Sequence, residues 1–304
     1  MKRANLPKNE IIDFYKNGQS CKKISLIYNV SESCVKTYLK LYGIEIKNLR
    51  ESHLKKKFNE NFFDIINTEE KAYWLGFMYA DGNIRKNIHK KGYESYVISL
   101  NQSEKEPLEK FINSINGKNI KISQRLTKEN KLIFSIVLNS KILYNGLNSK
   151  GCVPNKSLIL KYPANITKKL ENHFIRGYFD GDGSVYQLRN MVKFKNHVAI
   201  YNSGGITICG TFEFLTELKK RLQFLQNNGK NITKENRRIS NTWSLRFDSI
   251  KRLTIFYNYL YQDSIIYLQR KKDKFEQIFK ERCSTTIIGT PMRTPKVYKE
   301  EGIV

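Results

Sequence analysis

The chain has 304 residues and a formal net charge of +26, because 54 Lys and Arg outnumber 28 Asp and Glu. So large a positive excess favours a polyanionic partner, nucleic acid above all. No apolar run is long enough to span a bilayer, the basic start is not followed by the apolar stretch of a signal peptide, and the five cysteines include no CxxC pair. We therefore expect an intracellular protein of the cytoplasm, nucleoid or organelle matrix that is not secreted.

Apolar residues at helical spacing predict three short helices in residues 1–49, with Gly18 ending the first and Gly43 the third. Ser31 is expected to cap the third helix, which carries Val35, Tyr38, Leu39 and Leu41 on one face. The segment resembles a helix-turn-helix of the resolvase type, and a small three-helix bundle without a DNA role is the alternative. A DNA contact would use the polar face of the third helix, namely Ser33, Lys36, Thr37 and Lys40.

Residues 50–66 lose the apolar periodicity and gain charge, which indicates a basic linker. From residue 67 the pattern changes. Asn67 is the expected cap of a helix that has Glu69 and Glu70 in its first turn and ends at Gly82. Strand-like runs and helical stretches then alternate: strands at 95–100, 119–126 and 132–138, helices near 105–115 and 140–149.

The same order recurs in the second half of the chain. A helix from about residue 166 ends in "FIRGYFDGDG", and further segments follow: strands at 184–189, 197–201, 204–210 and 242–247, helices near 212–225 and 249–261. Asp81 and Asp182 end the two helices at a separation of 101 residues. This repeat predicts two α+β units with mostly antiparallel sheets, residues 67–164 and 165–282. Residues 283–304 show no clear periodicity and are interpreted as a tail without regular structure.

Small residues stand four apart in both helix ends, "WLGFMYADG" and "IRGYFDGDG": Gly76 with Ala80, and Gly177 with Gly181. Positions i and i+4 share one face of a helix, so the two helices are expected to pack against each other along these stripes. The packing would bring the carboxylates that follow the stripes together at the negative ends of both helices. Such a pair is suited to divalent cations with oxygen ligands.

Both segments resemble the LAGLIDADG motif, and over roughly residues 67–281 the chain is similar to the two-motif, single-chain LAGLIDADG homing endonucleases. Gly76 and Gly177 match the central glycine of the motif, and Asp81 and Asp182 match its metal-binding acid. The sequence departs from the motif in two ways. Leu75 and Arg176 replace its alanine, and Tyr79 stands where the second copy has Asp180.

The resemblance implies a fold and a site. The fold is α+β: two αββαββα units related by a pseudo-twofold axis form a DNA-binding saddle, preceded by the small all-α helix-turn-helix. The motif helices form the interface, and Mg²⁺ or Mn²⁺ binds at their ends, in a metal site made of Asp81, Asp182, Ala80 and Gly181. Lys156 and Lys271 are the expected basic residues of the active site. Base or phosphate contacts are expected from side chains on the strands: Arg85, Gln102, Lys121, Gln124, Arg125, Gln187, Arg189, Lys193, Arg237 and Arg246.

The function implied is that of a monomeric, site-specific, metal-dependent endonuclease that cuts both strands of DNA at a long asymmetric target. Two alternatives on the same scaffold stay open at this point: a cofactor for splicing of intron RNA, and a DNA-binding regulator that does not cleave. The presence of both motif acids weighs against the regulator, whereas a splicing cofactor that also cleaves would keep them.

Overall fold

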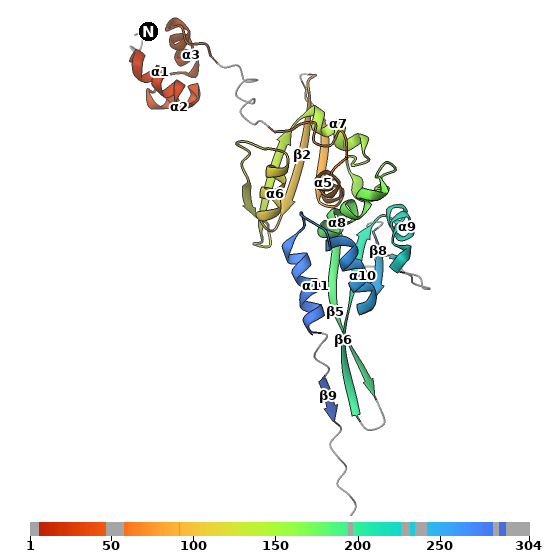
Figure 1. Ribbon diagram of the computed structural model, residues 1–304. Coiled ribbons are helices and arrows are strands. Elements are labelled where there is room, and N and C mark those ends of the chain that lie inside the picture. Colours follow the sequence, from red (N-terminus) through yellow and green to blue (C-terminus); the bar gives the residue numbers. More distant parts are fainter. Residues whose placement is uncertain are drawn as a thin grey trace, which may run out of the picture. The chain divides into compact units, whose positions relative to one another are not determined.

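Residues 6–46, 58–90, 92–193, 197–225, 232–234, 242–281 and 286–289 are described by a computed structural model (Figure 1). The chain divides into two compact units, residues 1–57 and residues 58–304, called here unit 1 and unit 2. Both motif segments lie in unit 2.

Within residues 6–46, unit 1 forms the three predicted helices, α1 (Lys8–Lys16), α2 (Cys21–Ile27) and α3 (Glu32–Leu41). Ser31 caps α3 as predicted, since its hydroxyl accepts a hydrogen bond from the Cys34 N–H at 3.2 Å. The expectation that Leu41 lies on the buried face is wrong: it is 75% exposed, because residues two apart, such as 39 and 41, point to different sides of a helix. The core of the unit is made by small and medium apolar residues, Leu6, Ile11, Cys21, Ile24, Val35 and Leu39.

The first half of unit 2 runs α5 (Glu69–Ala80), β1 (Gly82–Ile88), β2 (Glu94–Gln102), α6 (Glu106–Ser114), β3 (Ser123–Leu126), β4 (Leu132–Asn139) and α7 (Lys141–Ser149). Its described strands form an antiparallel sheet in the order β1-β2-β4-β3. This is one αββαββα unit.

The second half repeats that order with α8 (Glu171–Asp182), β5 (Gly183–Lys193), β6 (His197–Gly210), α9 (Phe212–Arg221), β7 (Ile232–Lys234), β8 (Trp243–Asp248) and α10 (Ile250–Tyr261). The sheet order is again outer-inner-inner-outer, β5-β6-β8-β7, and all pairs are antiparallel. Two elements extend this half: α11 (Gln269–Glu281), and β9 (Thr286–Gly289), which pairs with β6. The predicted duplication and fold class are therefore confirmed.

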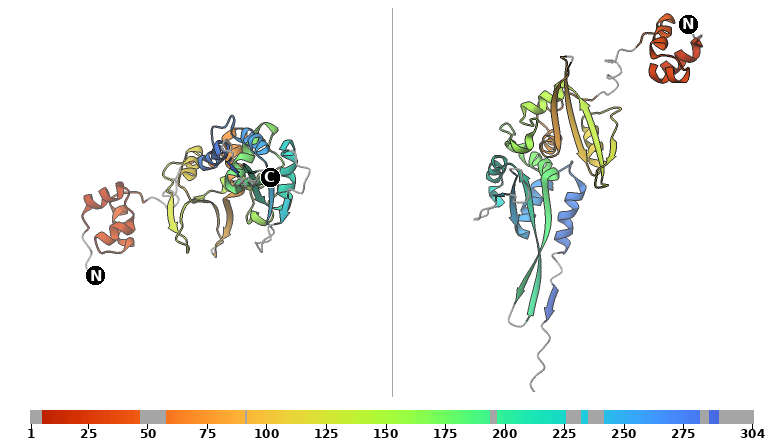
Figure 2. Two further views of the ribbon diagram at one scale, coloured as in Figure 1. Left: turned by 90° about the horizontal axis from the view of Figure 1, so that it is seen from below. Right: turned by 180° about the vertical axis from the view of Figure 1, so that it is seen from behind.

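In each half the helices pack on one face of the sheet, which we call the helix face. Figure 2 (left) shows the helices of unit 2 gathered on one side of both sheets. Ile84 pairs with Ile98, and Ile98 with Leu138, and all three are buried against helices. The opposite face, called here the open face, carries no helix in the described part of unit 2. Each sheet thus has one apolar side and one side available to a ligand.

The basic linker predicted at 50–66 extends too far. Phe62 and Phe63 are buried in the core of unit 2, where their rings meet edge to face with centroids 4.9 Å apart. Unit 2 accordingly begins at residue 58. The two phenylalanines within "NENFFDII" were the signal that this stretch joins a core.

Several boundaries also differ from the predictions. Thr68, not Asn67, caps α5, and its hydroxyl accepts from the Lys71 N–H at 3.3 Å. Residues 197–201 and 204–210 belong to one strand, β6, because glycines 204 and 205 continue the ladder. The predicted strand at 119–126 begins only at Ser123. Periodicity did not reveal β1, β7 or α11, and it missed β9 inside the predicted tail. The remainder of that tail lies outside the described residues.

Candidate active site at the ends of the paired motif helices

The helices α5 and α8 pack so closely that their backbones touch at the motif glycines. A Cβ at Gly76 would overlap the Phe174 carbonyl oxygen, and a Cβ at Gly177 would overlap the Tyr73 carbonyl oxygen. One turn further on, a Cβ at Gly181 would overlap the Ala80 methyl group. The small-residue stripes therefore form the helix interface, as predicted.

This packing brings the acid of each motif to the partner helix. Asp81 ends α5 with φ −98° and ψ −13°, and its Oδ2 lies 3.2 Å from where a Cβ of Gly181 would be. Asp182 is the last residue of α8. Burial raises the pKa of both carboxyls, and the charge of Asp81 is the second cause that raises the pKa of Asp182, to about 6. The two carboxylates therefore share one partly buried site and repel each other.

Gln102, at the end of β2, holds the Asp81 carboxylate. Its amide Nε2 donates to Asp81 Oδ2 at 2.7 Å. The side chain is only 6% exposed, so the prediction that Gln102 contacts a DNA base is wrong for this placement. The residue belongs to the acid site instead. Strand alternation indicates this placement. The even-numbered residues Ile98, Leu100 and Gln102 lie on the buried helix face of β2, so Gln102 points away from the open face.

The two lysines chosen from the sequence occupy matching places in the two halves. Lys156 Nζ donates to the carbonyl oxygens of Ala80 (3.0 Å) and Gly82 (2.5 Å), on either side of Asp81. Lys271 Nζ donates to the carbonyl oxygen of Gly183, the residue after Asp182. Both side chains are buried, so each ammonium group is held at the end of one motif helix.

Lys271 is perturbed by its surroundings. Burial and the positive charge of Arg270 lower its pKa to about 8, although the nearby acids Asp180, Asp81 and Asp182 act in the opposite direction. A pKa of about 8 is closer to neutral pH than that of an ordinary lysine. Lys156 acts on the acids too, since its charge lowers the pKa of both Asp81 and Asp182.

The oxygen donors at this site fit a hard divalent cation. Within the described part of the chain, no group of three or more His, Cys, Asp or Glu is placed to hold a metal ion. The acidic donors at the ends of the motif helices are the pair Asp81 and Asp182. A cation between them would relieve the repulsion that raises the pKa of Asp182. The carbonyl of Ala80 accepts a hydrogen bond from Lys156, so this carbonyl is engaged by the lysine in the present arrangement.

Asp180 is a different kind of acid, although it lies two residues from Asp182. It is completely buried and accepts three hydrogen bonds: from the hydroxyls of Tyr73 (2.9 Å) and Tyr261 (2.7 Å) and from the Leu268 N–H (2.7 Å). Every carboxylate oxygen is therefore occupied by the protein. Of the two acids in "YFDGDGSV", only Asp182 is available to a cation.

Arg176, which replaces the alanine of the motif, is also buried and fully engaged. Its guanidinium pairs with Glu69 of α5 at 2.6 Å and donates to the carbonyl oxygens of Ile266 and Leu260, both at 2.8 Å. The departure from the motif thus ties α8 to the other motif helix and to the segment after α10. Leu75, at the corresponding place in α5, is buried in the apolar core.

Strand register divides the predicted DNA-contacting residues into two groups. Arg85 and Arg125 are exposed on the open face of the first sheet, and Arg246 is exposed on the open face of the second. The other group points to the helix side of its sheet: Gln102, Gln124, Gln187 and Arg189. Gln124 and Arg189 are nevertheless exposed, so their contacts with DNA stay predictions. Gln187 in addition donates to Glu281 of α11 at 2.5 Å.

Three predicted contacts cannot be placed on either face. Lys121 is exposed but precedes β3. Lys193 ends β5 in a stretch whose side chains are not described, and Arg237 lies outside the described residues. All three stay predictions.

Arg246 is oriented by two neighbours that sequence reasoning did not identify. Its guanidinium lies 4.8 Å from the centre of the Tyr186 ring, and its Nε donates to both carboxylate oxygens of Asp248 at 3.1 Å. Tyr186 also donates its hydroxyl to Asp248. Strand alternation in "GSVYQLR" indicates the position of Tyr186, because it places Tyr186 and Ser184 on the open face together.

In unit 1, the four residues predicted to contact DNA form one exposed surface of α3: Ser33, Lys36, Thr37 and Lys40. Lys36 pairs with Glu32 at 2.6 Å on the surface, and such exposed pairs contribute little to stability. The contact of these four residues with DNA stays a prediction. Among the described residues, none of the helices has the length and apolar character required to cross a membrane.

The fold is similar to solved structures of endonucleases. Meganuclease I-SmaMI bound to uncleavable DNA matches 72% of this chain and 90% of its own, with a TM-score of 0.50 and 12% identity. LAGLIDADG meganuclease I-AabMI bound to uncleaved DNA matches 69% and 89%, with a TM-score of 0.49 and 9% identity. The I-LtrWI LAGLIDADG homing endonuclease bound to target DNA matches 73% and 91%, with a TM-score of 0.45 and 12% identity.

No protein-family model and no curated protein matches the sequence. The structural likeness, together with the two motif helices packed at their glycines, identifies the architecture of unit 2: it has the LAGLIDADG homing endonuclease fold.

Proposed function

We propose that the chain is a site-specific, metal-dependent DNA endonuclease that hydrolyses one phosphodiester bond in each strand of a long asymmetric duplex target. One observation carries the proposal: Asp81 and Asp182, 101 residues apart in the sequence, share a site at the ends of paired helices, each with a buried lysine beside it. I-SmaMI, whose fold is similar, is a meganuclease that binds DNA. The net charge of +26 supports the same class of partner.

Asp81 and Asp182 would hold Mg²⁺ or Mn²⁺, and the bound cation would supply Lewis-acid activation of water and of the scissile phosphate. Side chains of the protein would orient the acids and stabilise charge on the phosphate. Gln102 fixes the orientation of the Asp81 carboxylate through its 2.7 Å bond. Lys156 and Lys271 place positive charge where negative charge develops on the phosphate. An ammonium group has three N–H donors, so Lys271, with one bonded to Gly183, keeps donors for the substrate.

Base and phosphate contacts are assigned to the open faces of the two sheets. Arg85, Arg125 and Arg246 are exposed there, and arginine is suited to bidentate contacts with guanine in the major groove. Unit 1 would extend the contact through the exposed surface of α3. The intact acid and lysine pairs favour cleavage over a purely regulatory role. The chain is proposed to act as a monomer, because it carries both motif acids and both lysines.

The test begins with a library of random duplexes, incubated with the full chain and Mg²⁺ and sequenced at the cut ends to obtain the target. On that target, Asp81→Asn and Asp182→Asn are expected to bind DNA within about threefold of the wild type and to lose double-strand cutting by a factor of roughly 10³ or more. The matched control is Asp13→Asn, which removes an exposed carboxylate of α1. Double-strand cutting by either motif variant at the wild-type rate, or cutting that persists in EDTA, would refute the proposal.

A further inference from the structure

The residue two positions before each motif acid is buried and has no part in the chemistry described so far. These residues are Tyr79 in α5 and Asp180 in α8, and both are almost or completely inaccessible. They occupy corresponding places in the two halves but differ in chemistry. What they bind is in both cases the chain segment that leads to the lysine of the same half.

Asp180 holds the start of α11. The Leu268 N–H donates to Asp180 Oδ2 at 2.7 Å, and the carbonyl oxygen of Leu268 accepts from the Lys271 N–H at 3.0 Å. Leu268 therefore links Asp180 directly to the first turn of α11, which carries Lys271. The Lys271 side chain then returns to α8 and donates to the Gly183 carbonyl oxygen. The end of α8 and the start of α11 are joined at two points.

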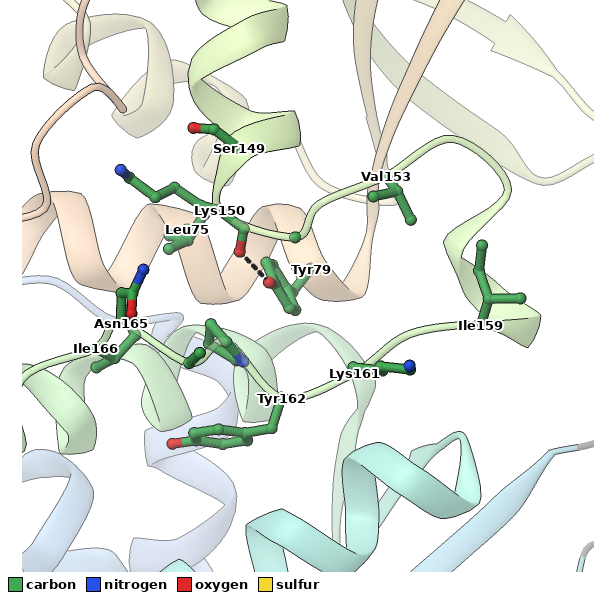
Figure 3. A pocket seen from close by; sticks show the side chains of 13 residues that line it. Leu75, Tyr79, Ser149, Lys150, Val153, Ile159, Lys161, Tyr162, Asn165 and Ile166 are labelled. Atoms are coloured by element: carbon green, nitrogen blue, oxygen red, sulfur yellow. Dashed lines mark hydrogen bonds between the residues drawn. The ribbon is translucent and has the colours of Figure 1, made fainter.

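Tyr79 does the equivalent in the first half. Its hydroxyl donates to the carbonyl oxygen of Lys150, just after α7 (Figure 3). The contact is tight, because a Cβ at Gly151 would overlap the Tyr79 hydroxyl. The segment that begins there leads to Lys156, whose ammonium group binds the carbonyls of Ala80 and Gly82. Both halves thus anchor a lysine-bearing segment through the same motif position.

We propose that Asp180 is a positioning residue for Lys271 and Tyr79 a positioning residue for Lys156, so that each anchor controls cleavage of one DNA strand. The inference rests on the proposed endonuclease function for its strand assignment, but the positioning itself can be measured without cleavage. The position of α11 matters because Lys271 is only 9% exposed. A buried side chain has few alternative conformations, so a shift of the start of α11 would break its bond to the Gly183 carbonyl oxygen.

If Asp180 served stability alone, loss of any of its buried hydrogen bonds should have a similar effect on Lys271. Tyr261 donates to Asp180 Oδ1, whereas Leu268 is bound by Oδ2. Tyr261→Phe therefore removes a buried hydrogen bond of the same acid without touching the bond to Leu268. It serves as the matched control for lost stability. Asp180→Leu removes all three bonds, and Asp180→Asn keeps an amide oxygen that can accept from the Leu268 N–H.

The first measurement is the reactivity of individual lysines with acetic anhydride, read by mass spectrometry on the full chain without DNA. Asp180→Leu is expected to increase acetylation of Lys271 several-fold and to leave Lys156 unchanged, and Tyr79→Phe is expected to do the reverse. Asp180→Asn and Tyr261→Phe should resemble the wild type. Equal reactivity of Lys271 in wild type and Asp180→Leu, with both folded by circular dichroism, would overturn the positioning.

The second measurement follows each strand of an end-labelled target duplex. Lys271→Met and Lys156→Met first show which strand depends on which lysine. Asp180→Leu should slow the Lys271-dependent strand by roughly 10- to 100-fold, the scale of a misplaced catalytic group, and Tyr79→Phe should slow the other strand. Equal slowing of both strands would overturn the strand assignment. A wild-type chain that cuts no duplex would overturn the endonuclease proposal, while the acetylation result would still decide the positioning.

Discussion

Asp180 and Asp182 show how far two carboxyls on one helix turn can differ. Burial raises the pKa of each to about 6. For Asp180 every other influence lowers the pKa, because Tyr261, Leu268 and Tyr73 donate to it and Arg176 is near. For Asp182 the charge of Asp81 adds to the burial. One acid is satisfied by the protein, and the other is left with repulsion that a ligand can relieve.

This difference gives a prediction for the metal-free protein. The pKa of Asp182 is raised from 3.8 to about 6 by folding, so its stabilising contribution is complete below pH 3.8 and is lost as the pH rises through 6. Asp182→Asn avoids that loss. In EDTA at pH 7.5 it should increase the free energy of unfolding by roughly 1 to 3 kcal/mol, and near pH 4 it should have no effect. Lys156, Lys271 and Tyr178 oppose the shift, which favours the lower figure.

Urea denaturation at the two pH values measures this effect, and Mg²⁺ supplies its control. Mg²⁺ should stabilise the wild type and leave Asp182→Asn nearly unchanged, because only a ligand bound to the folded state raises its stability. A variant that is less stable than the wild type at pH 7.5 in EDTA would show that Asp182 is not under repulsion.

At this scale the sequence predicted what spacing and residue type determine. The two acids end the motif helices, as the motif spacing predicted. Both lysines lie beside those helix ends, and their catalytic roles stay predictions. Gln102 was assigned to DNA. Alternation in β2 indicates which face its side chain takes, but nothing in the local sequence shows that this face meets Asp81. That contact joins residues 21 positions apart through the pairing of β1 with β2.

The element that decides the site is the pair α5 and α8. Tyr73 and Phe174 are large, but their backbone carbonyls rather than their side chains face Gly177 and Gly76. Backbone cannot move aside as a flexible side chain can. The glycines therefore set how near the two carboxylates come, and the site is a consequence of helix packing.

Gly177→Ala tests this dependence. The added methyl group overlaps the Tyr73 carbonyl oxygen, so the helices must separate, at a cost of about 3 kcal/mol or more. Gly146→Ala in α7 is the matched control, because its methyl group would find Asp64 Oδ1 at 3.1 Å and the Phe63 side chain at 3.4 Å. There the gain in helix propensity, about 1 kcal/mol, offsets mild crowding. Thermal unfolding of both variants measures the contrast, and equal melting temperatures would contradict the packing.

Strands were harder to predict than helices at the same scale. The runs around residues 98 and 136 were recognised from their apolar residues, but the face of each side chain depends on register. Gly82 and Gly183 mark the inward face, because a Cβ at each would meet Met78 and Phe179, respectively. Counting from those glycines places Arg85 outward in its sheet and Gln187 inward, an inference the sequence would have allowed. The short β7 and the tail strand β9 have no such marker.

For the whole molecule, the repeat of 101 residues predicted two halves with the same order of elements, and the matching sheet orders confirm this duplication. The halves nevertheless differ at two motif positions: α5 has Leu75 and Tyr79 where α8 has Arg176 and Asp180. The motif alone could not show that each substitution serves a segment more than 70 residues away. Unit 1 lies outside this symmetry and adds charge to one end of the chain.

Unit 1 provides the last prediction. Residues 1–57 contain 13 Lys or Arg and five Asp or Glu, and α3 exposes Lys36 and Lys40. If α3 contacts phosphates, Lys36→Ala with Lys40→Ala should weaken DNA binding and lower the slope of log K against log salt by about 0.9 per lost contact, or roughly 1 to 2. Lys8→Ala with Lys16→Ala removes the same charge from α1, where both lysines are exposed, and should change the slope less.

Fluorescence anisotropy with the labelled target at several salt concentrations gives both slopes. Cleavage in saturating DNA should be unaffected in either double variant, because the acids and lysines of the active site all lie in unit 2. If the α3 and α1 variants change the slope equally, the contribution of unit 1 is a diffuse charge effect rather than a contact by one helix face. If neither changes it, α3 does not contact the duplex, and the recognition surface is confined to the open faces of the two sheets.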